Sequence, residues 1–132
     1  MESFTVSADL PATTKQIFEA WLSSEGHSRM TGSQAEVEGG SGGTFKAWDG
    51  YIWGKTLELE PNHRILQAWR TSEFPEDSPD SRVEILLEEV ADGTKVTLNH
   101  TEIPDGQGDS YKQGWEDFYF APMRAYYNES SG

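Results

Sequence analysis

Between residues 42 and 69 the sequence alternates apolar and polar positions in short runs, and this pattern restricts the possible folds more than any other feature. Each run ends in a turn signal: Gly42-Gly43, Asp49-Gly50 or Pro61-Asn62. Such runs are typical of consecutive antiparallel strands joined by tight turns. Large aromatic residues lie near the strand ends: Trp48, Trp53 and Trp69. Bulky aromatic side chains on a strongly bent sheet form either a large core or the wall of a cavity.

The chain has 132 residues, no cysteine, and 10 basic against 23 acidic side chains, which gives a net charge of −13. A chain of this length forms one hydrophobic core, so we expect a single domain over residues 1–132. Disulfides and thiolate chemistry are excluded. The negative charge repels phosphate groups, so we expect no nucleic acid and no membrane as a partner. The usual interpretation of a surplus of acidic side chains is that it keeps the protein soluble. The alternative is that it attracts a basic protein partner.

The N-terminus carries no targeting signal. Residues 1–10 lack the basic and apolar regions of a signal peptide. No apolar run approaches the roughly 20 residues that cross a bilayer. We therefore expect a cytoplasmic protein.

The predicted order of elements is one strand, two short helices, six antiparallel strands and one long helix. Thr13 and Gln16 form a capping box that opens a helix running to Leu22. Ser24 is expected to cap a second helix that ends before Gly32. Strands are expected at residues 4–8, 34–38, 43–48, 51–60, 64–71, 82–90 and 94–101.

The last two strands are expected to form a hairpin through Asp92-Gly93. Their inward faces should then point the same way: Val83, Ile85 and Leu87 with Val96, Leu98 and His100. After Asp109 aromatic residues recur at steps of three and four, which predicts a helix over residues 109–127: Tyr111, Trp115, Phe118, Tyr119 and Tyr126. Pro122 should bend this helix or divide it.

Five short motifs follow one another along the chain: Gly42-Gly43-x-Phe45, Asp49-Gly50-x-Ile52-x-Gly54, Leu59-x-Pro61, Ile65-x-x-x-Trp69-Arg70, and Gly114-Trp115 with Tyr119-Phe120. In order and spacing they resemble the C-terminal domain of the activator of Hsp90 ATPase, a family of the START-like (SRPBCC) superfamily. The resemblance covers the chain from Phe4 to Tyr127. It implies an α+β helix-grip fold, in which a curved antiparallel sheet of about seven strands surrounds a long C-terminal helix.

The resemblance also implies a function. Members of the superfamily commonly hold a small hydrophobic molecule between the helix and the sheet. The eukaryotic activators stimulate their chaperone with two domains, and their N-terminal domain binds the chaperone's middle segment. This sequence begins at the first strand of the second domain, so by itself we expect no strong stimulation of a chaperone ATPase.

The inward-facing residues expected to bind a ligand are mainly aromatic and aliphatic: Phe18, Trp21, Met30, Phe45, Trp69, Ile85, Leu87, Leu98, His100, Trp115, Phe118 and Tyr119. Apolar cavities of about 300–1,000 Å³ suit small ligands. The alternative is that these side chains simply fill a core. His100 would hydrogen-bond a ligand oxygen or act as a general base, or else be a core histidine satisfied by a neighbour. Three further aromatic residues would form a cavity rim, an exposed recognition patch or a cover over the bend of the sheet: Trp48, Tyr51 and Trp53.

Nothing in the sequence carries a catalytic or cofactor signature. The glycines of residues 39–43 lack the lysine and the helix of a phosphate-binding loop. The histidines are too far apart in the strand order for a metal triad: His27, His63 and His100. No nucleophile elbow is present, so we expect no cofactor, no metal and no catalytic residue.

The first functional hypothesis is therefore binding of a small hydrophobic or aromatic molecule between the helix and the sheet. The second is a protein-interaction module related to Hsp90 co-chaperones of the stress response, with a chaperone as partner. The third is a cofactor-free enzyme that uses His100.

Overall fold

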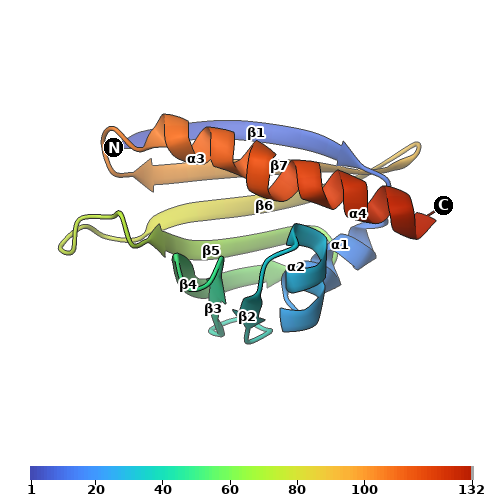
Figure 1. Ribbon diagram of the computed structural model, residues 1–132, viewed down its shortest axis with the longest axis horizontal. Coiled ribbons are helices and arrows are strands. Elements are labelled where there is room, and N and C mark those ends of the chain that lie inside the picture. Colours follow the sequence, from blue (N-terminus) through green and yellow to red (C-terminus); the bar gives the residue numbers. More distant parts are fainter. Residues whose placement is uncertain (132) are drawn as a thin grey trace.

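The computed structural model describes residues 1–131, in which seven antiparallel strands form one curved sheet and the long C-terminal helical segment lies across it (Figure 1). The strand order is β1-β7-β6-β5-β4-β3-β2. The strands are β1 Glu2–Leu10, β2 Ala35–Val37, β3 Thr44–Ala47, β4 Ile52–Glu60, β5 Arg64–Thr71, β6 Ser81–Val90 and β7 Gly93–Ile103. The helices are α1 Thr14–Trp21, α2 Ser24–Thr31, α3 Gly108–Trp115, the π turn η1 Glu116–Phe120, and α4 Ala121–Ser131. The predicted α+β helix-grip fold is confirmed.

The register of β6 and β7 confirms the predicted inward face of this hairpin. Cα partners are Val83 with His100, Ile85 with Leu98 and Leu87 with Val96. The loop itself consists of Ala91 and Asp92, because Gly93 already pairs with Val90. Gly93 has φ 151°, and a Cβ there would lie 2.0 Å from the carbonyl oxygen of Leu10. Glycine at this position therefore lets the end of β1 approach the hairpin.

The caps of the short helices agree with those predicted from the sequence, with one exception. The Thr13 hydroxyl accepts from the Gln16 amide at 3.0 Å, and the Gln16 side chain accepts from the Thr13 amide at 2.8 Å, so the predicted capping box is confirmed. The cap of α2 is Ser23 and not Ser24. The Ser24 hydroxyl instead accepts from the Val37 amide at 2.8 Å and ties α2 to β2. α2 ends before Gly32, as predicted, and Gly32 adopts a left-handed conformation there.

The C-terminal segment is helical over the predicted range but contains one wide turn. In η1 the Ala121 amide donates to the carbonyl of Glu116, five residues back. Pro122 follows at once and has no N–H to offer the carbonyl of Phe118, so an ordinary α-helical bond is impossible at this point. The buried positions then recur every four residues: Tyr111, Trp115, Tyr119, Met123 and Tyr127.

The π turn corrects two expectations about the aromatic stripe. Phe118 was expected to face inward, but its exposed fraction is 55%. Tyr126 is only half-buried, while its neighbour Tyr127 is buried. The extra residue in the wide turn rotates everything after it, so the inward positions fall one residue later than a regular helical period predicts.

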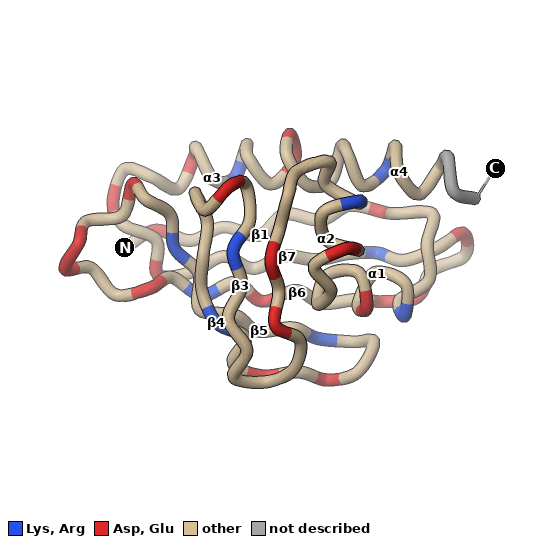
Figure 2. The backbone as a smooth tube through the Cα atoms, turned by 60° about the horizontal axis from the view of Figure 1, so that its bottom comes forward, with Lys and Arg blue, Asp and Glu red and all other residues tan. Residues whose placement is uncertain are grey.

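Within residues 1–131, none of the helices combines the length and the apolar character that crossing a bilayer requires. Acidic residues lie on strands, loops and helices alike and do not gather in one patch (Figure 2).

Candidate ligand pocket

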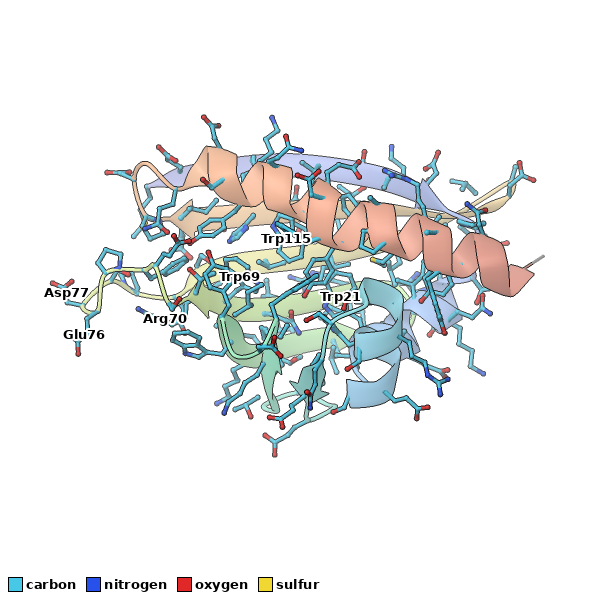
Figure 3. The ribbon with its side chains drawn as sticks, in the orientation of Figure 1. Trp21, Trp69, Arg70, Glu76, Asp77 and Trp115 are labelled. Atoms are coloured by element: carbon cyan, nitrogen blue, oxygen red, sulfur yellow. The ribbon has the colours of Figure 1, made fainter. Side chains whose placement is uncertain are left out.

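A pocket of about 400 Å³ lies between the start of the C-terminal helical segment and the strands β4 and β5. Its sheet side is lined by Trp48, Tyr51, Ile52 and Trp69, and its helix side by Ser110, Tyr111, Gly114, Trp115, Phe118 and Tyr119. Figure 3 shows Trp69 and Trp115 together in the space between sheet and helix, where their ring centroids are 5.6 Å apart. Most of the lining is therefore aromatic, and the volume is within the range of about 300–1,000 Å³ typical of small-ligand sites.

His100 packs against the rings of Trp69 and Trp115, and both of its ring nitrogens are hydrogen-bonded. The Trp115 indole N–H donates to Nδ1 at 3.1 Å, so Nδ1 carries no proton. Nε2 then donates to the Ser81 hydroxyl at 2.9 Å, and that hydroxyl donates to the Trp69 carbonyl at 2.7 Å. Burial lowers the pKa of His100 to about 3. His100 is thus a neutral, fully buried core residue, and it does not contribute to the pocket lining.

A second histidine network holds the inner end of the pocket. The Tyr119 hydroxyl and Nε2 of His27 are 2.9 Å apart, and Nδ1 of His27 lies 3.0 Å from the Trp21 carbonyl. Because a carbonyl only accepts, Nδ1 carries the proton and Nε2 accepts from the tyrosine. Burial lowers the pKa of His27 and raises the pKa of Tyr119. The network therefore fixes the ring of Tyr119, which stacks on the ring of Trp21 with centroids 5.3 Å apart.

The outer end of the pocket carries a polar cluster. The Tyr51 hydroxyl donates to the Glu73 carboxylate. The Tyr111 hydroxyl lies 2.7 Å from the Thr71 hydroxyl and donates to Gln107 Oε1 at 2.6 Å. Burial, followed by the bond to Glu73, raises the pKa of Tyr51. An apolar interior with a few polar groups at one end can orient a ligand that has one polar end.

Trp48 occupies an unusual backbone position beside the pocket. Its φ is 54° and that of Asp49 is 56°, which is the left-handed region that bulky residues rarely adopt. Its indole nitrogen is buried and has no hydrogen-bond partner within the described part of the chain. Backbone strain of this kind costs about 1–3 kcal/mol and is concentrated at functional sites. The conformation holds the Trp48 ring against the aromatic side chains of η1.

The structure brings only part of the predicted ligand-binding set into the pocket. Four of these residues line it: Trp69, Trp115, Phe118 and Tyr119. Most of the others are buried in the packed core: Trp21, Met30, Phe45, Ile85, Leu87, Leu98 and His100. Phe18 is half-buried against that core. The strands β6 and β7 contribute to the filled core, whereas the pocket opens over β4 and β5.

Four residues that line the pocket were not among the ligand-binding residues predicted from the sequence: Ile52, Ser110, Tyr111 and Gly114. Trp48 and Tyr51 were expected as a possible rim, and both line the pocket, but Trp53 does not. The helical spacing of positions 110, 111, 114, 115 and 118 places them on one face, which is the signal that could have identified the helix side. The role of all these residues in binding stays a prediction.

Comparisons with known proteins agree with one another. The family model described as "Activator of Hsp90 ATPase homolog 1-like protein" matches residues 11–128. The chain is similar to the mouse (Mus musculus) "Activator of 90 kDa heat shock protein ATPase homolog 2", with 26% identity over 112 residues, which cover 85% of this chain and 34% of the mouse protein. The chain thus spans about a third of the length of these curated relatives, although most of the chain itself is matched.

Two solved structures are similar over nearly the whole chain. One is an HSP90 activator from Plasmodium falciparum, with a TM-score of 0.84, 25% identity, and coverage of 95% of this chain and 95% of that one. The other is CalU16 from Micromonospora echinospora, with a TM-score of 0.78, 24% identity, and coverage of 94% of this chain and 74% of that one. At this identity the second likeness concerns the fold alone.

Proposed function

We propose, for a chain that belongs to the Activator of Hsp90 ATPase homolog 1-like family, that it binds a small hydrophobic or aromatic molecule in the pocket between α3 and the strands β4 and β5. The observation that carries this proposal is the aromatic pocket itself. Its walls come from both sides of the fold, so a bound molecule would contact sheet and helix together. We also propose that the protein works in the cytoplasm, the location expected from the sequence.

The rigidity of the walls supports this choice. The rings of Trp69, Trp115 and Tyr119 are already packed against one another or fixed by hydrogen bonds before any ligand arrives. A preformed site loses little side-chain entropy when it binds, so more of the interaction energy contributes to affinity. Planar molecules that stack on these rings are the class of ligand the walls fit best.

The test fills the pocket from the helix side. A Cβ on Gly114 would meet only the Phe118 ring within 4 Å, at 3.7 Å, which is an ordinary contact. Because Gly114 lines the pocket, the further atoms of a larger side chain would take up pocket volume. Gly114→Leu should therefore abolish binding of a neutral aromatic probe, 2-naphthylmethanol, in an NMR titration. Gly114→Ala adds one methyl group and should weaken binding only in part. The proposal is wrong if the natural chain shows no saturable binding of this probe, or if Gly114→Leu binds it equally well.

Contact with a chaperone is a second candidate function, supported by the family and by the likeness to the Plasmodium activator. The relevant surface would lie outside the pocket, for which the exposed ring of Trp53 is the strongest candidate. The test measures ATP hydrolysis by an Hsp90 in the presence of this chain. Stimulation at low micromolar concentration that Gly114→Leu retains and Trp53→Ala loses would place this function first.

The enzyme hypothesis receives no support from the position of His100. A general base needs a free nitrogen within reach of the substrate. Here Nδ1 is occupied by Trp115 and Nε2 by Ser81, and the ring lies outside the pocket lining. We therefore do not propose a reaction that depends on this histidine.

A further inference from the structure

The hydrogen-bond donors at the outer end of the pocket are mostly used within the protein. Tyr51 donates its one hydroxyl proton to Glu73, and Tyr111 donates its own to Gln107. The side-chain amide of Gln107 donates to the Glu73 carbonyl at 3.0 Å. The Ser110 hydroxyl also lines the pocket and can either donate or accept. The unpaired N–H of Trp48 also belongs to the lining, but that ring lies against Phe118 and Tyr119. A ligand whose polar group lies among the Tyr51 and Tyr111 hydroxyls and offers only acceptors would therefore find few partners there.

Acceptors, in contrast, remain available. Glu73 uses Oε2 for the bond to Tyr51, and its Oε1 makes no hydrogen bond with any other residue in the described range 1–131. The Tyr51 oxygen has two lone pairs after donating its proton, and the neighbouring Thr71 hydroxyl can occupy one of them, which leaves the other available. Glu73 is exposed, and it is joined by this single hydrogen bond to a residue of the pocket wall. The polar end of the pocket is thus suited to a ligand that donates.

The charges around this end favour the same kind of ligand. Arg70 lies on the neighbouring strand β5, but its guanidinium is bound to Asp80 at 2.9 Å and to the carbonyls of Pro75 and Ser78 at 3.1 Å each. Lys112 follows Tyr111 on α3 and is exposed. Acidic residues outnumber basic ones by 23 to 10 and are spread over the whole molecule (Figure 2). The overall field therefore attracts cations and repels anions.

We infer that the pocket selects an aromatic molecule whose polar end is a cation or a hydrogen-bond donor, such as an aromatic amine, and disfavours the matching carboxylate. The rings of Trp69, Trp115 and Tyr119 hold the apolar part, and Glu73 together with the Tyr51 oxygen receives the donor. This inference rests on the proposed function, since it names the ligand class of the same pocket.

The test compares three probes that share one ring system: 2-naphthylmethylamine, 2-naphthylmethanol and 2-naphthoate, each titrated at neutral pH and low salt. The amine should bind about tenfold more tightly than the carboxylate, and the alcohol should lie between them, because an exposed ion pair contributes modestly. If the alcohol binds and the carboxylate matches or exceeds the amine, the inference is overturned and the proposed function stands. If none of the three binds saturably, the proposed function itself fails.

Two variants of one loop locate the selectivity. Glu73→Gln keeps an oxygen that can accept from Tyr51 but removes the charge, so the amine should lose about fivefold in affinity while the alcohol changes less than about twofold. Glu76→Gln is the matched control, because Glu76 points away from the helix and from Trp69 at the far end of the same loop (Figure 3). It should leave all three affinities unchanged. An unchanged amine affinity in Glu73→Gln, or an equal loss in Glu76→Gln, would show that Glu73 does not recognise the ligand.

Discussion

The ring of Trp48 packs edge-on against the ring of Phe118, with centroids 5.3 Å apart and planes at 64°. Trp48 stands in a left-handed turn before β4, and Phe118 stands in the π turn between α3 and α4. Two uncommon backbone conformations thus meet at one side of the pocket. Both kinds of feature occur often at functional sites, which supports the choice of this pocket over the other concave parts of the surface.

Trp115 should be among the most sensitive core positions. Trp115→Ala is expected to lower the free energy of unfolding by about 3–5 kcal/mol, the usual loss for a buried large aromatic side chain. Trp115→Phe keeps much of the ring but leaves Nδ1 of His100 without its donor, so a loss of about 1–3 kcal/mol is expected. Denaturant unfolding measures both. A Trp115→Phe protein as stable as the natural chain would mean that the hydrogen bond contributes nothing.

Acid should weaken the fold before its carboxylates are protonated. His27 and His100 both have a pKa below the ordinary value in the folded chain, chiefly through burial. In the unfolded chain they bind protons near pH 6.5, so their contribution is fully present above that pH and is lost as the pH falls below it, for His100 down to about 3. The expected slope is at most about 1.4 kcal/mol per pH unit for each histidine.

Unfolding measured between pH 5 and pH 7 isolates this effect, because free carboxylates stay ionised there. His100→Gln should reduce the slope in this range by up to about half, since one of the two buried histidines is removed. A slope identical to that of the natural chain would contradict the assignment of His100 as a histidine that stays neutral in the folded state.

Gly114→Ala should stabilise the protein, although it narrows the pocket. Glycine inside a helix is less favourable than alanine by about 0.5–1 kcal/mol, and the added methyl group would make only an ordinary contact with the Phe118 ring, at 3.7 Å. Thermal unfolding provides the measurement. Gly26→Ala is the matched control in another helix: a Cβ there would lie 2.7 Å from the Cα of Ala20, so that variant should be destabilised.

The two serines at the start of α2 should have separable effects. Ser23→Ala removes the cap and should cost about 1 kcal/mol, with faster hydrogen exchange at the Gly26 amide that Ser23 accepts from. Ser24→Ala should leave that amide protected and expose the Val37 amide instead. If Ser24→Ala instead exposed the Gly26 amide and Ser23→Ala did not, Ser24 would be the cap.

Where local chemistry decides the outcome, the sequence was sufficient to predict the fold. The capping box at Thr13, the inward face of the β6–β7 hairpin and the end of α2 at Gly32 depend on neighbours in the chain or on a period of two. The cap at Ser23 was misplaced by one residue, because both serines have the right chemistry and only the path of β2 shows which one is engaged elsewhere. A single domain over residues 1–132 stays a prediction.

The pocket was predicted less well because a cavity forms where side chains from distant parts of the chain leave space between them. Leu98 and Met30 had the right polarity for a pocket wall, yet other side chains cover them completely. Tyr111 was recognised as part of the aromatic stripe but not as a wall, since its distance from the sheet follows from the tilt of the helix. Phe118 moved outward because of the wide turn before Pro122. The proline predicted an interruption of the helix, but not that the interruption would be a π turn.

The π turn also shows where the C-terminal segment can tolerate a change in length. It holds one residue more than an α-helical turn, so removing one residue from η1 would leave a regular helix of about 3.6 residues per turn. Met123 and Tyr127 would then still face the sheet, and Tyr111 and Trp115 would keep their places. A deletion inside α3 or α4 would instead rotate the residues on one side of it by about 100° relative to those on the other. Related chains can therefore differ by one residue at η1 and keep both the packing of α4 and the face of α3 that lines the pocket.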